Sequence, residues 1–422
     1  MPEPALIGEW EGICPLVGGL GKGERVSALA LVDWEMFGGK LYLVRMGCFA
    51  GYRLVIWDQE GGMPLERLRK KGVGCVMWMN RGKRLAAGLV FILCGGLLAG
   101  CSPAVREEHP ANIRIGVTVY DQYDTFVSQL IEKFNAYASE KEAESKVAIN
   151  IETYNAADSQ TTQNSQVETM LSDGCNVICV NLVDRTEPSV IIDMAEQSGV
   201  PVIFFNRELV EEDLERWDQL YYVGAKAFES GIMQGEIAVD VFKNNPQADK
   251  NGDGVFQYVV LEGEAGHQDA IVRTEYSVST VIEEGVEMEK LSYAIANWNR
   301  AQAQTKMAQM LGEYGGEIEL VLANNDDMAL GAVDALKAAG IAQEQWPVIV
   351  GIDGTDVGLA AVKNGELAGT VYNNKEGQAL AMLNLAYELS VGGSLSELGL
   401  EDGKYIRLPY AKIGPEDVAD YE

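Results

Sequence analysis

The sequence predicts an α/β protein of two lobes, each built around a mainly parallel sheet. Two observations carry this prediction. From Ile113 onward, short β-rich runs alternate with longer amphipathic stretches, which is the pattern of βαβ units. Polar or aromatic residues follow several of these runs, and in open α/β sheets ligands bind beyond the carboxyl ends of the strands. The chain has 422 residues, enough to bury a core in each lobe.

Ten β-rich runs fall into two groups of five along the chain. The first group comprises residues 113–119, 147–153, 176–181, 201–205 and 220–223. The second comprises residues 256–261, 288–293, 318–323, 347–352 and 368–372. Taken singly, polar residues after a strand are more often turn formers than ligands. In series we expect them to face a shared cleft, and the segments concerned read VYDQYDTF, VNLVD, FFNRE, LEGEAGHQD, LANND and GIDGTD.

Charge excludes several kinds of partner. The chain has 33 basic and 63 acidic side chains, a formal charge of −30. Residues 1–100 hold 12 basic and 9 acidic ones, which leaves 21 and 54 for the remainder. A segment with this much negative charge repels phosphate backbones and anionic lipids. Nucleic acid is therefore a poor candidate partner, and neutral or cationic ligands fit better. Cys175 and Cys179 lie in one apolar run, GCNVICVN, and are predicted to be buried. If this run is a strand, their four-residue separation spans about 13 Å, which is beyond disulfide reach.

Residues 79–100 have the order of features of a secretory signal, in which basic MNRGKR precedes an apolar run. The run ends in LAGC, which resembles the lipobox of bacterial lipoproteins and predicts cleavage before Cys101 and its lipid modification. Residues 101–112 are then a spacer. An uncleaved membrane helix is the alternative, but about 17 apolar or small residues lie at the lower limit for spanning. Because a signal peptide opens its chain, we interpret residues 1–78 as translation from a misassigned start codon, with a cytoplasmic domain as the alternative.

A calcium-binding turn is predicted within residues 249–257. Oxygen-bearing side chains stand at positions 1, 3, 5 and 9, with glycine at position 6, which is the spacing of an EF-hand loop. Position 12 is Val260 instead of the usual glutamate, so a carboxylate from elsewhere must complete the site. An Asp- and Gly-rich turn without metal is the alternative. The candidate ligands are Asp249, Asn251, Asp253, the carbonyl of Val255 and Gln257.

Asp269 and Arg273 stand four residues apart at the start of an expected helix and therefore share one face. An exposed ion pair is the default for this spacing, whereas the same pair aimed into a cleft can bond to vicinal hydroxyls. Phe126 and Trp298 are aromatic candidates for covering the apolar face of a sugar, with ordinary core packing as the alternative. The chain has only two histidines, His109 and His267, and His109 lies in the predicted spacer. A His-rich metal or triad site is therefore excluded.

The strings from Ile113 to about Ile413 resemble the periplasmic galactose/glucose-binding proteins. They include IGVTVYDQYDTF, PVIFFNRE, DKNGDG, LEGEAGHQDAIVRT, NWNRAQAQTKM and VGIDGTD. The resemblance implies the type I periplasmic-binding-protein fold, with two Rossmann-like lobes joined by a three-segment hinge and closing over a pyranose. It implies an N-terminal lobe of residues 113–222 plus 374–407 and a C-terminal lobe of residues 223–373 plus 408–422.

The resemblance also assigns residues. The sugar would lie between Phe126 and Trp298, and its hydroxyls would bond to Asp124, Asn181, His267, Asp269, Arg273, Asn325, Asp353 and Asn373. Glu319 would supply the calcium ligand that the turn lacks. Two features depart from the family: the order of Asp and Tyr in YDQYDTF, and the lipobox, since periplasmic members are soluble. The tether indicates a cell without an outer membrane.

The implied function is that of a solute-binding lipoprotein of an ABC importer on the extracytoplasmic face of the membrane, and not an enzyme. The implied partners are D-galactose or D-glucose and the importer's membrane subunits, with calcium as cofactor, a monomeric state and a chemoreceptor as a further partner to consider. Three alternatives stay open: binding of another monosaccharide, a glycosidase that uses clustered carboxylates, and a sugar-responsive repressor. The repressor would need a basic helix-turn-helix where the signal sequence stands.

Overall fold

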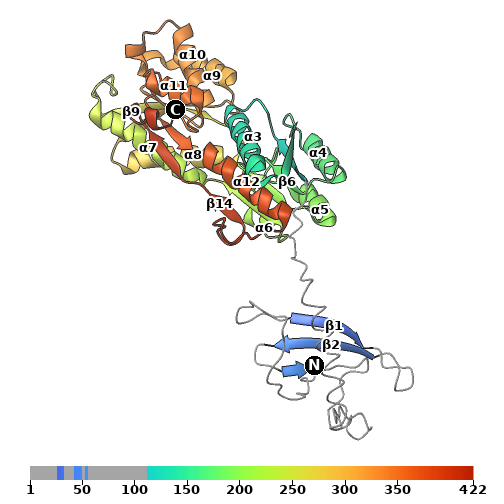
Figure 1. The fold of residues 1–422 in the computed structure, drawn as a ribbon. Helices are drawn as coiled ribbons and strands as arrows, with labels where there is room; N and C mark the ends of the chain where they lie inside the picture. The colour runs from blue at the N-terminus through green and yellow to red at the C-terminus, as the bar shows by residue number, and fades with distance from the viewer. Residues whose placement is uncertain (1–25, 33–41, 50–52, 56–111, 422) are drawn as a thin grey trace, which may run out of the picture. The chain divides into compact units, whose positions relative to one another are not determined.

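The computed structural model describes residues 26–32, 42–49, 53–55 and 112–421, and the chain divides into two units, Met1–Arg106 and Glu107–Glu422. The first unit contains an antiparallel sheet of β1 (Val26–Val32), β2 (Tyr42–Phe49) and β3 (Arg53–Val55) (Figure 1). The sequence shows no sustained strand period there, so this sheet was not predicted. The predicted signal sequence, the lipidated Cys101 and the spacer up to residue 111 lie outside the described residues.

The first lobe of the second unit is built on a six-stranded sheet in which every neighbouring pair is parallel. Its order is β14-β8-β7-β6-β4-β5. The central strands are continuous apolar runs because helices cover both of their faces. The strands are β4 (Asn112–Val119), β5 (Ala148–Asn155), β6 (Val177–Val180), β7 (Val202–Phe205), β8 (Leu220–Gly224) and β14 (Tyr405–Arg407).

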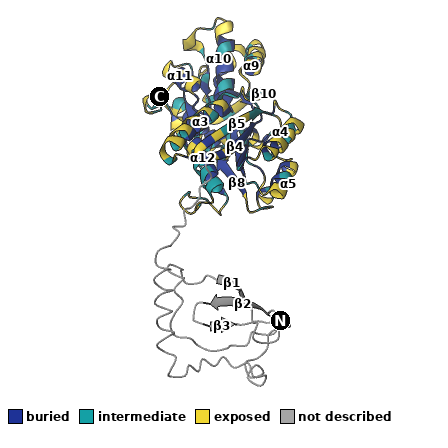
Figure 2. Ribbon diagram, turned by 45° about the vertical axis from the view of Figure 1, so that its right-hand side comes forward, coloured by how far each residue is buried: buried dark blue, intermediate teal, exposed yellow. Residues whose placement is uncertain are grey.

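Alternate residues of these strands supply two cores. Cys179, Ile203 and Phe205 pack under α3 and α12, whereas Ile178 and Phe204 pack under α4 and α5. Both Cys175 and Cys179 are buried free thiols, which confirms the prediction for them. Buried strands lie beneath helices whose outer faces are exposed (Figure 2). The helices are α3 (Thr125–Ser145), α4 (Gln160–Ser172), α5 (Ser189–Ser198), α6 (Glu211–Leu214) and α12 (Lys375–Val391).

The second lobe has a parallel sheet of order β10-β9-β11-β12 and an antiparallel pair, β13 with β15. Bridges from Val350 to Gly369 and from Asp353 to Tyr372 join the pair to β12. The strands are β9 (Val255–Glu262), β10 (Glu287–Ile295), β11 (Leu320–Ala323), β12 (Val348–Val350), β13 (Thr370–Asn373) and β15 (Tyr410–Ile413). Its helices are α7 (Ala227–Asn244), α8 (Gln268–Glu283), α9 (Arg300–Tyr314), α10 (Asp326–Ala338) and α11 (Asp356–Lys363), with short 3-10 turns at Gly315–Glu317, Gln343–Gln345 and Val418–Asp420.

The chain passes between the lobes three times: from β8 to α7, from β13 to α12, and from β14 to β15. All ten predicted strands are present, so the two-lobe α/β prediction is confirmed. The short strands β14 and β15 were not predicted. None of the helices in the described part of the chain combines the length and the apolar character that crossing a bilayer requires.

Candidate functional site

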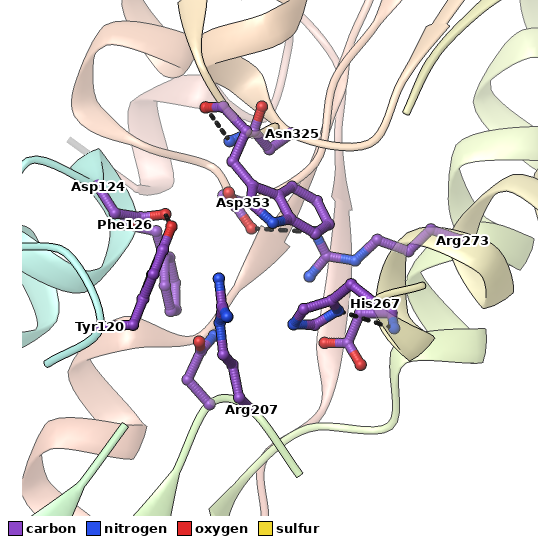
Figure 3. A pocket seen from close by; sticks show the side chains of 11 residues that line it. Tyr120, Asp124, Phe126, Arg207, His267, Arg273, Asn325 and Asp353 are labelled. Carbon is purple, nitrogen blue, oxygen red and sulfur yellow. Dashed lines mark hydrogen bonds and ion pairs between the residues drawn. The ribbon is translucent and has the colours of Figure 1, made fainter. Parts of the chain in front are cut away.

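A pocket lies between the two lobes, beyond the carboxyl ends of their strands (Figure 3). Segments that follow β4 and β7 supply its first-lobe wall, and segments that follow β9, β10, β11 and β12 supply its second-lobe wall. The eleven lining residues therefore come from six separate stretches of chain. They are Tyr120, Asp124, Phe126, Asn206, Arg207, His267, Asp269, Arg273, Trp298, Asn325 and Asp353.

Arg273 is the central cation of the second-lobe wall. Its side chain is 4% exposed, and its Nη1 donates to the carbonyl of Asn324 at 2.7 Å and lies 3.6 Å from Oδ1 of Asp353. The guanidinium carbon lies 5.7 Å from the centre of a Trp298 ring. Its buried Nε has no hydrogen-bond partner among the described protein groups. The carbonyl and the carboxylate thus hold the guanidinium in place while one donor remains unused.

Asp353 occupies a strained turn at the end of β12. Its φ is +119°, a conformation that side chains other than glycine rarely adopt. Two backbone hydrogen bonds hold the turn: Asp353 N donates to Val371 O at 2.8 Å, and Asn373 N donates to Asp353 O at 3.0 Å. Burial raises the pKa of Asp353 well above its usual range, and the neighbouring Arg273 opposes that shift. A residue held under strain in a pocket is a candidate functional residue.

His267 caps the start of α8. Its Nδ1 accepts from the backbone N–H of Asp269 at 3.1 Å, so the neutral ring carries its proton on Nε2. Burial lowers the pKa of His267 to about 4, which keeps the ring neutral at pH 7. Its ring meets that of Trp298 edge-on, with centroids 5.3 Å apart. Gly263 makes room for this indole, because a Cβ there would lie 2.3 Å from the Trp298 ring.

On the first-lobe wall, Asp124 caps α3. Its Oδ1 accepts from Val127 N at 2.8 Å, and its Oδ2 accepts from the hydroxyl of Tyr120 at 2.6 Å. Phe126, only 4% exposed, belongs to the core beneath α3 and also lines the pocket. On the opposite wall, Asn325 caps α10 by accepting from Met328 N at 2.9 Å. The helix starts therefore fix several of the polar side chains.

Arg207 was not among the predicted sugar-binding residues, although its segment FFNRE was expected to face the cleft. It is 4% exposed, and its guanidinium lies 3.6 Å from the centre of the Tyr120 ring. Its Nη1 donates to Val183 O at 2.9 Å, and its Nη2 lies 3.0 Å from Oε2 of Glu264 on the second lobe. Tyr120 and Asn206 line the pocket as well; they lie in segments that were expected to face the cleft but were not assigned to sugar binding. The position of Arg207 after a buried strand was the signal available in the sequence.

Eight of the ten predicted sugar-binding residues line this pocket, and Asn181 and Asn373 do not. Both asparagines are buried and are bonded to protein groups. Nδ2 of Asn181 donates to Asn206 Oδ1 at 3.0 Å and to Phe205 O at 3.1 Å. Oδ1 of Asn373 accepts from Gln378 Nε2 at 2.6 Å. In this arrangement Asn181 orients a lining residue, while Asn373 holds the strained Asp353 turn through its backbone.

The turn at residues 249–257 lies apart from the pocket residues. Asp253 Oδ2 accepts from the side-chain amides of Asn251 and Gln257, at 2.9 and 3.0 Å. Oε1 and Oε2 of Glu319, which is 1% exposed, accept from Lys250 N at 2.5 Å and Gln257 N at 3.3 Å. Within the described residues no three His, Cys, Asp or Glu side chains form a metal-binding group. The side chains bonded to one another at this turn are carboxylates and amides, and oxygen donors of this kind suit a hard cation such as calcium.

A model of a periplasmic binding protein domain matches residues 115–394. A D-galactose/methyl-galactoside binding periplasmic protein of Haemophilus influenzae is 35% identical over 315 residues, 74% of this chain and 92% of that protein. A xylitol-binding protein of Mycolicibacterium smegmatis is 32% identical and is covered over 78% of its length, against 73% of this chain. An ABC transporter solute-binding protein from Bacillus halodurans, solved with myo-inositol, has a TM-score of 0.61 and 29% identity, covering 74% of this chain and 97% of that one. The chain belongs to the periplasmic-binding-protein family.

Proposed function

We propose that this protein is the extracytoplasmic solute-binding component of an ABC importer and that it binds one hexose, D-galactose or D-glucose. The observation that carries the proposal is a single pocket lined from opposite lobes by Phe126 and Trp298 and by ionisable side chains between them. Aromatic faces cover the apolar face of a pyranose. The galactose-binding relative supports the choice of hexose.

An uncharged sugar is bound through many hydrogen bonds and stacked rings. The carboxylates of Asp124, Asp269 and Asp353 accept hydrogen bonds from the sugar hydroxyls, and Arg207 and Arg273 donate hydrogen bonds to the sugar oxygens. Such charge-assisted bonds contribute about 1.5–3 kcal/mol each. Because Asp353 pairs with Arg273 and Glu264 with Arg207, both arginines of the pocket are balanced by protein carboxylates and need no charge from the ligand.

Closure of the two lobes removes water from this pocket. Two direct contacts across the cleft support a hinge motion: Thr125 Oγ1 donates to Asp327 Oδ2 at 2.6 Å, and Arg207 meets Glu264 at 3.0 Å. The three crossings supply the short segments that such hinges use. In the proposed cycle the sugar stabilises the closed form, and the importer's membrane subunits bind that form.

Calcium binding at residues 249–257 is a second part of the proposal. Glu319 supports it, because within the described part of the chain this buried carboxylate accepts hydrogen bonds from backbone N–H groups alone, and these belong to Lys250, Asn251 and Gln257 of the turn. Bound calcium would supply positive charge to a turn that carries Asp249, Asp253 and Glu319. We further propose a lipid anchor at Cys101, which would hold the protein at the outer face of the membrane.

A second candidate ligand is a cyclitol or another polyol. Arg207 favours it, because a second buried guanidinium in the pocket gives additional donors for a ring that bears hydroxyls on every carbon. The Bacillus halodurans neighbour was solved with myo-inositol. A hexose has an oxygen in its ring and a cyclitol has none, and their hydroxyl patterns differ. The relative affinities of the protein for the two ligands therefore distinguish the two candidates.

Isothermal titration calorimetry of the purified protein with galactose, glucose, xylitol and myo-inositol tests the proposal. We expect the tightest binding with galactose or glucose, and a smaller radius of gyration by small-angle scattering when the sugar saturates. A preference for myo-inositol would favour the cyclitol. Lack of binding to all four, or hydrolysis of a nitrophenyl galactoside, would overturn the assignment.

A further inference from the structure

Lys375 is a fully buried lysine at a crossing between the lobes. It is the first residue of α12, directly after the passage from β13, and it is 2% exposed. Burial of an ammonium group is costly unless the group is paired. A cation at the start of a helix is also unfavourable, because the helix dipole is positive there. An uncharged side chain of similar length would avoid both costs, so the contacts of Lys375 need an explanation.

These contacts lead to the turn that carries Asp353. Nζ of Lys375 donates to the carbonyl of Gly354 at 3.1 Å and lies 3.5 Å from Oδ1 of Asp356. The hydrogen bond to Gly354 is made by a helix of the first lobe to a loop of the second lobe. On its own helix, Glu376 lies 3.8 Å from the same ammonium. Lys375 thus joins the two lobes immediately beside a pocket residue.

The turn itself needs such support. Both Asp353 and Gly354 have positive φ, +119° and +64°. Gly354 lies against Tyr372 so closely that an added Cβ would be 2.9 Å from the Tyr372 Cα. The peptide between Gly354 and its successor is therefore constrained by packing on one side and by Lys375 at its carbonyl oxygen. A second first-lobe contact is weaker, from Asp356 N to Gln129 Oε1 at 3.4 Å.

We propose that Lys375 is a positioning residue, which holds the strained Asp353–Gly354 turn and so sets the place of the Asp353 carboxylate opposite Arg273. It contacts the turn and not the pocket, since it is absent from the pocket lining. The inference rests on the proposed function in one respect, namely that the ligand contacts Asp353. It assigns a role in binding to a residue that lies behind the site.

Two variants test the proposal in the full chain. K375M keeps the length of the side chain but removes the charge and the donor. K337M is the matched control, because Lys337 forms an exposed ion pair with Glu366 at 2.6 Å on helices away from the pocket. K375M loses one charged hydrogen bond, so it should bind the ligand about 10-fold more weakly than the parent protein does. The ligand used is the one of the four calorimetric candidates that the parent binds most tightly. K337M should bind like the parent protein.

Coupling to Asp353 separates positioning from a general loss of structure. In a D353N background we expect K375M to weaken binding by less than about 2-fold, because the turn then no longer places a carboxylate. An equal loss in both backgrounds, or an unchanged affinity in the parent background, would overturn the proposal. Should K375M fail to fold, K375Q enters the same cycle with the same expected outcomes.

A readout without ligand keeps this proposal separate from the choice of sugar. Hydrogen exchange measured by mass spectrometry should show faster exchange of the segment 351–357 in K375M and no change there in K337M. Faster exchange together with no binding of any hexose would refute the proposed sugar and leave the role of Lys375 supported. Unchanged exchange in this segment would refute that role even where the hexose binds.

Discussion

The cleft and the turn at residues 249–257 both gather acidic side chains, but they differ in what compensates the charge. In the cleft, Asp353 faces Arg273 at 3.6 Å and Glu264 faces Arg207 at 3.0 Å. At the turn, the described residues form no ion pair with Asp249, Asp253 or Glu319, and Lys250 directs its ammonium to the carbonyls of Ile318 and Gln345. The arginines of the cleft pair with its carboxylates and thus suit a neutral ligand, whereas carboxylates without an ion-pair partner, as at the turn, favour a cationic ligand.

Replacement of Arg273 by methionine is expected to give the largest effect. The change removes the charged donors that Arg273 offers to the sugar, and a loss of about 3 kcal/mol corresponds to roughly 100-fold weaker sugar binding. R300M is the matched control, because Arg300 is bonded to Asp334 outside the pocket. Calorimetry measures both variants. Equal affinities of R273M and R300M for the sugar would show that the Arg273 cation is not required for binding a neutral ligand.

Removal of calcium tests the turn at residues 249–257. A metal at about 1,000 times its Kd stabilises the folded state by about 4 kcal/mol, so a chelator should lower the Tm by several degrees. E319Q should lower the Tm in calcium and make it insensitive to the chelator. E317Q, a change at an exposed neighbouring glutamate, should keep the full response. A parent Tm that ignores both calcium and chelator would show that the turn holds no metal.

The neutral state of His267 predicts a dependence of stability on pH. Burial lowers its pKa in the folded protein to about 4, below the ordinary 6.5. The unfolded chain therefore takes up a proton first as the pH falls. Stability that is present above pH 6.5 is lost between about pH 6.5 and 4, by up to about 3 kcal/mol at 1.36 kcal/mol for each unit.

Comparison with H267N isolates this contribution, since asparagine can still cap α8. The comparison is needed because burial raises the pKa of Asp326 to about 6, which acts in the opposite direction. Urea unfolding of both proteins at pH 7 and pH 4.5 gives the difference. We expect the parent to lose more stability than H267N does. Equal losses would mean that His267 titrates normally in the folded protein.

The contrast between cleft and turn also explains what could be predicted from the sequence. The buried parallel strands β6, β7, β8 and β11 are short runs of apolar residues that the sequence identifies directly, whereas β14 and β15 are short, and each includes a basic residue. The turn at residues 249–257 is contiguous, so spacing alone predicted all its candidate calcium ligands except Glu319. The pocket is assembled from six stretches of chain, so spacing and residue type proposed only Asp269, Arg273, Phe126 and Trp298, and the resemblance assigned the other sugar-binding candidates.

Arg207 shows why the remainder of the pocket could not be predicted. An arginine after a strand is usually exposed, and only the packing of Tyr120 beneath its guanidinium and the approach of Glu264 from the other lobe bury it. Asn181 and Asn373 show the opposite case. Their residue types suit hydroxyl binding, but protein partners use their side-chain groups in this structure. Such competition for hydrogen bonds depends on tertiary contacts that no local pattern contains.

The smallest expected effect concerns the contact between Arg207 and Glu264. Because 44% of the Glu264 side chain is exposed, solvent screens the pair, and its contribution is about 0.2–1 kcal/mol. E264Q should therefore weaken sugar binding by at most about 5-fold at low salt, and added salt should reduce the difference. E366Q, which removes a comparable pair with Lys337 away from the cleft, should leave affinity unchanged. Tighter binding by E264Q would mean that Glu264 competes with the sugar for the Arg207 donors, so that the cation serves the ligand directly and not the closure of the lobes.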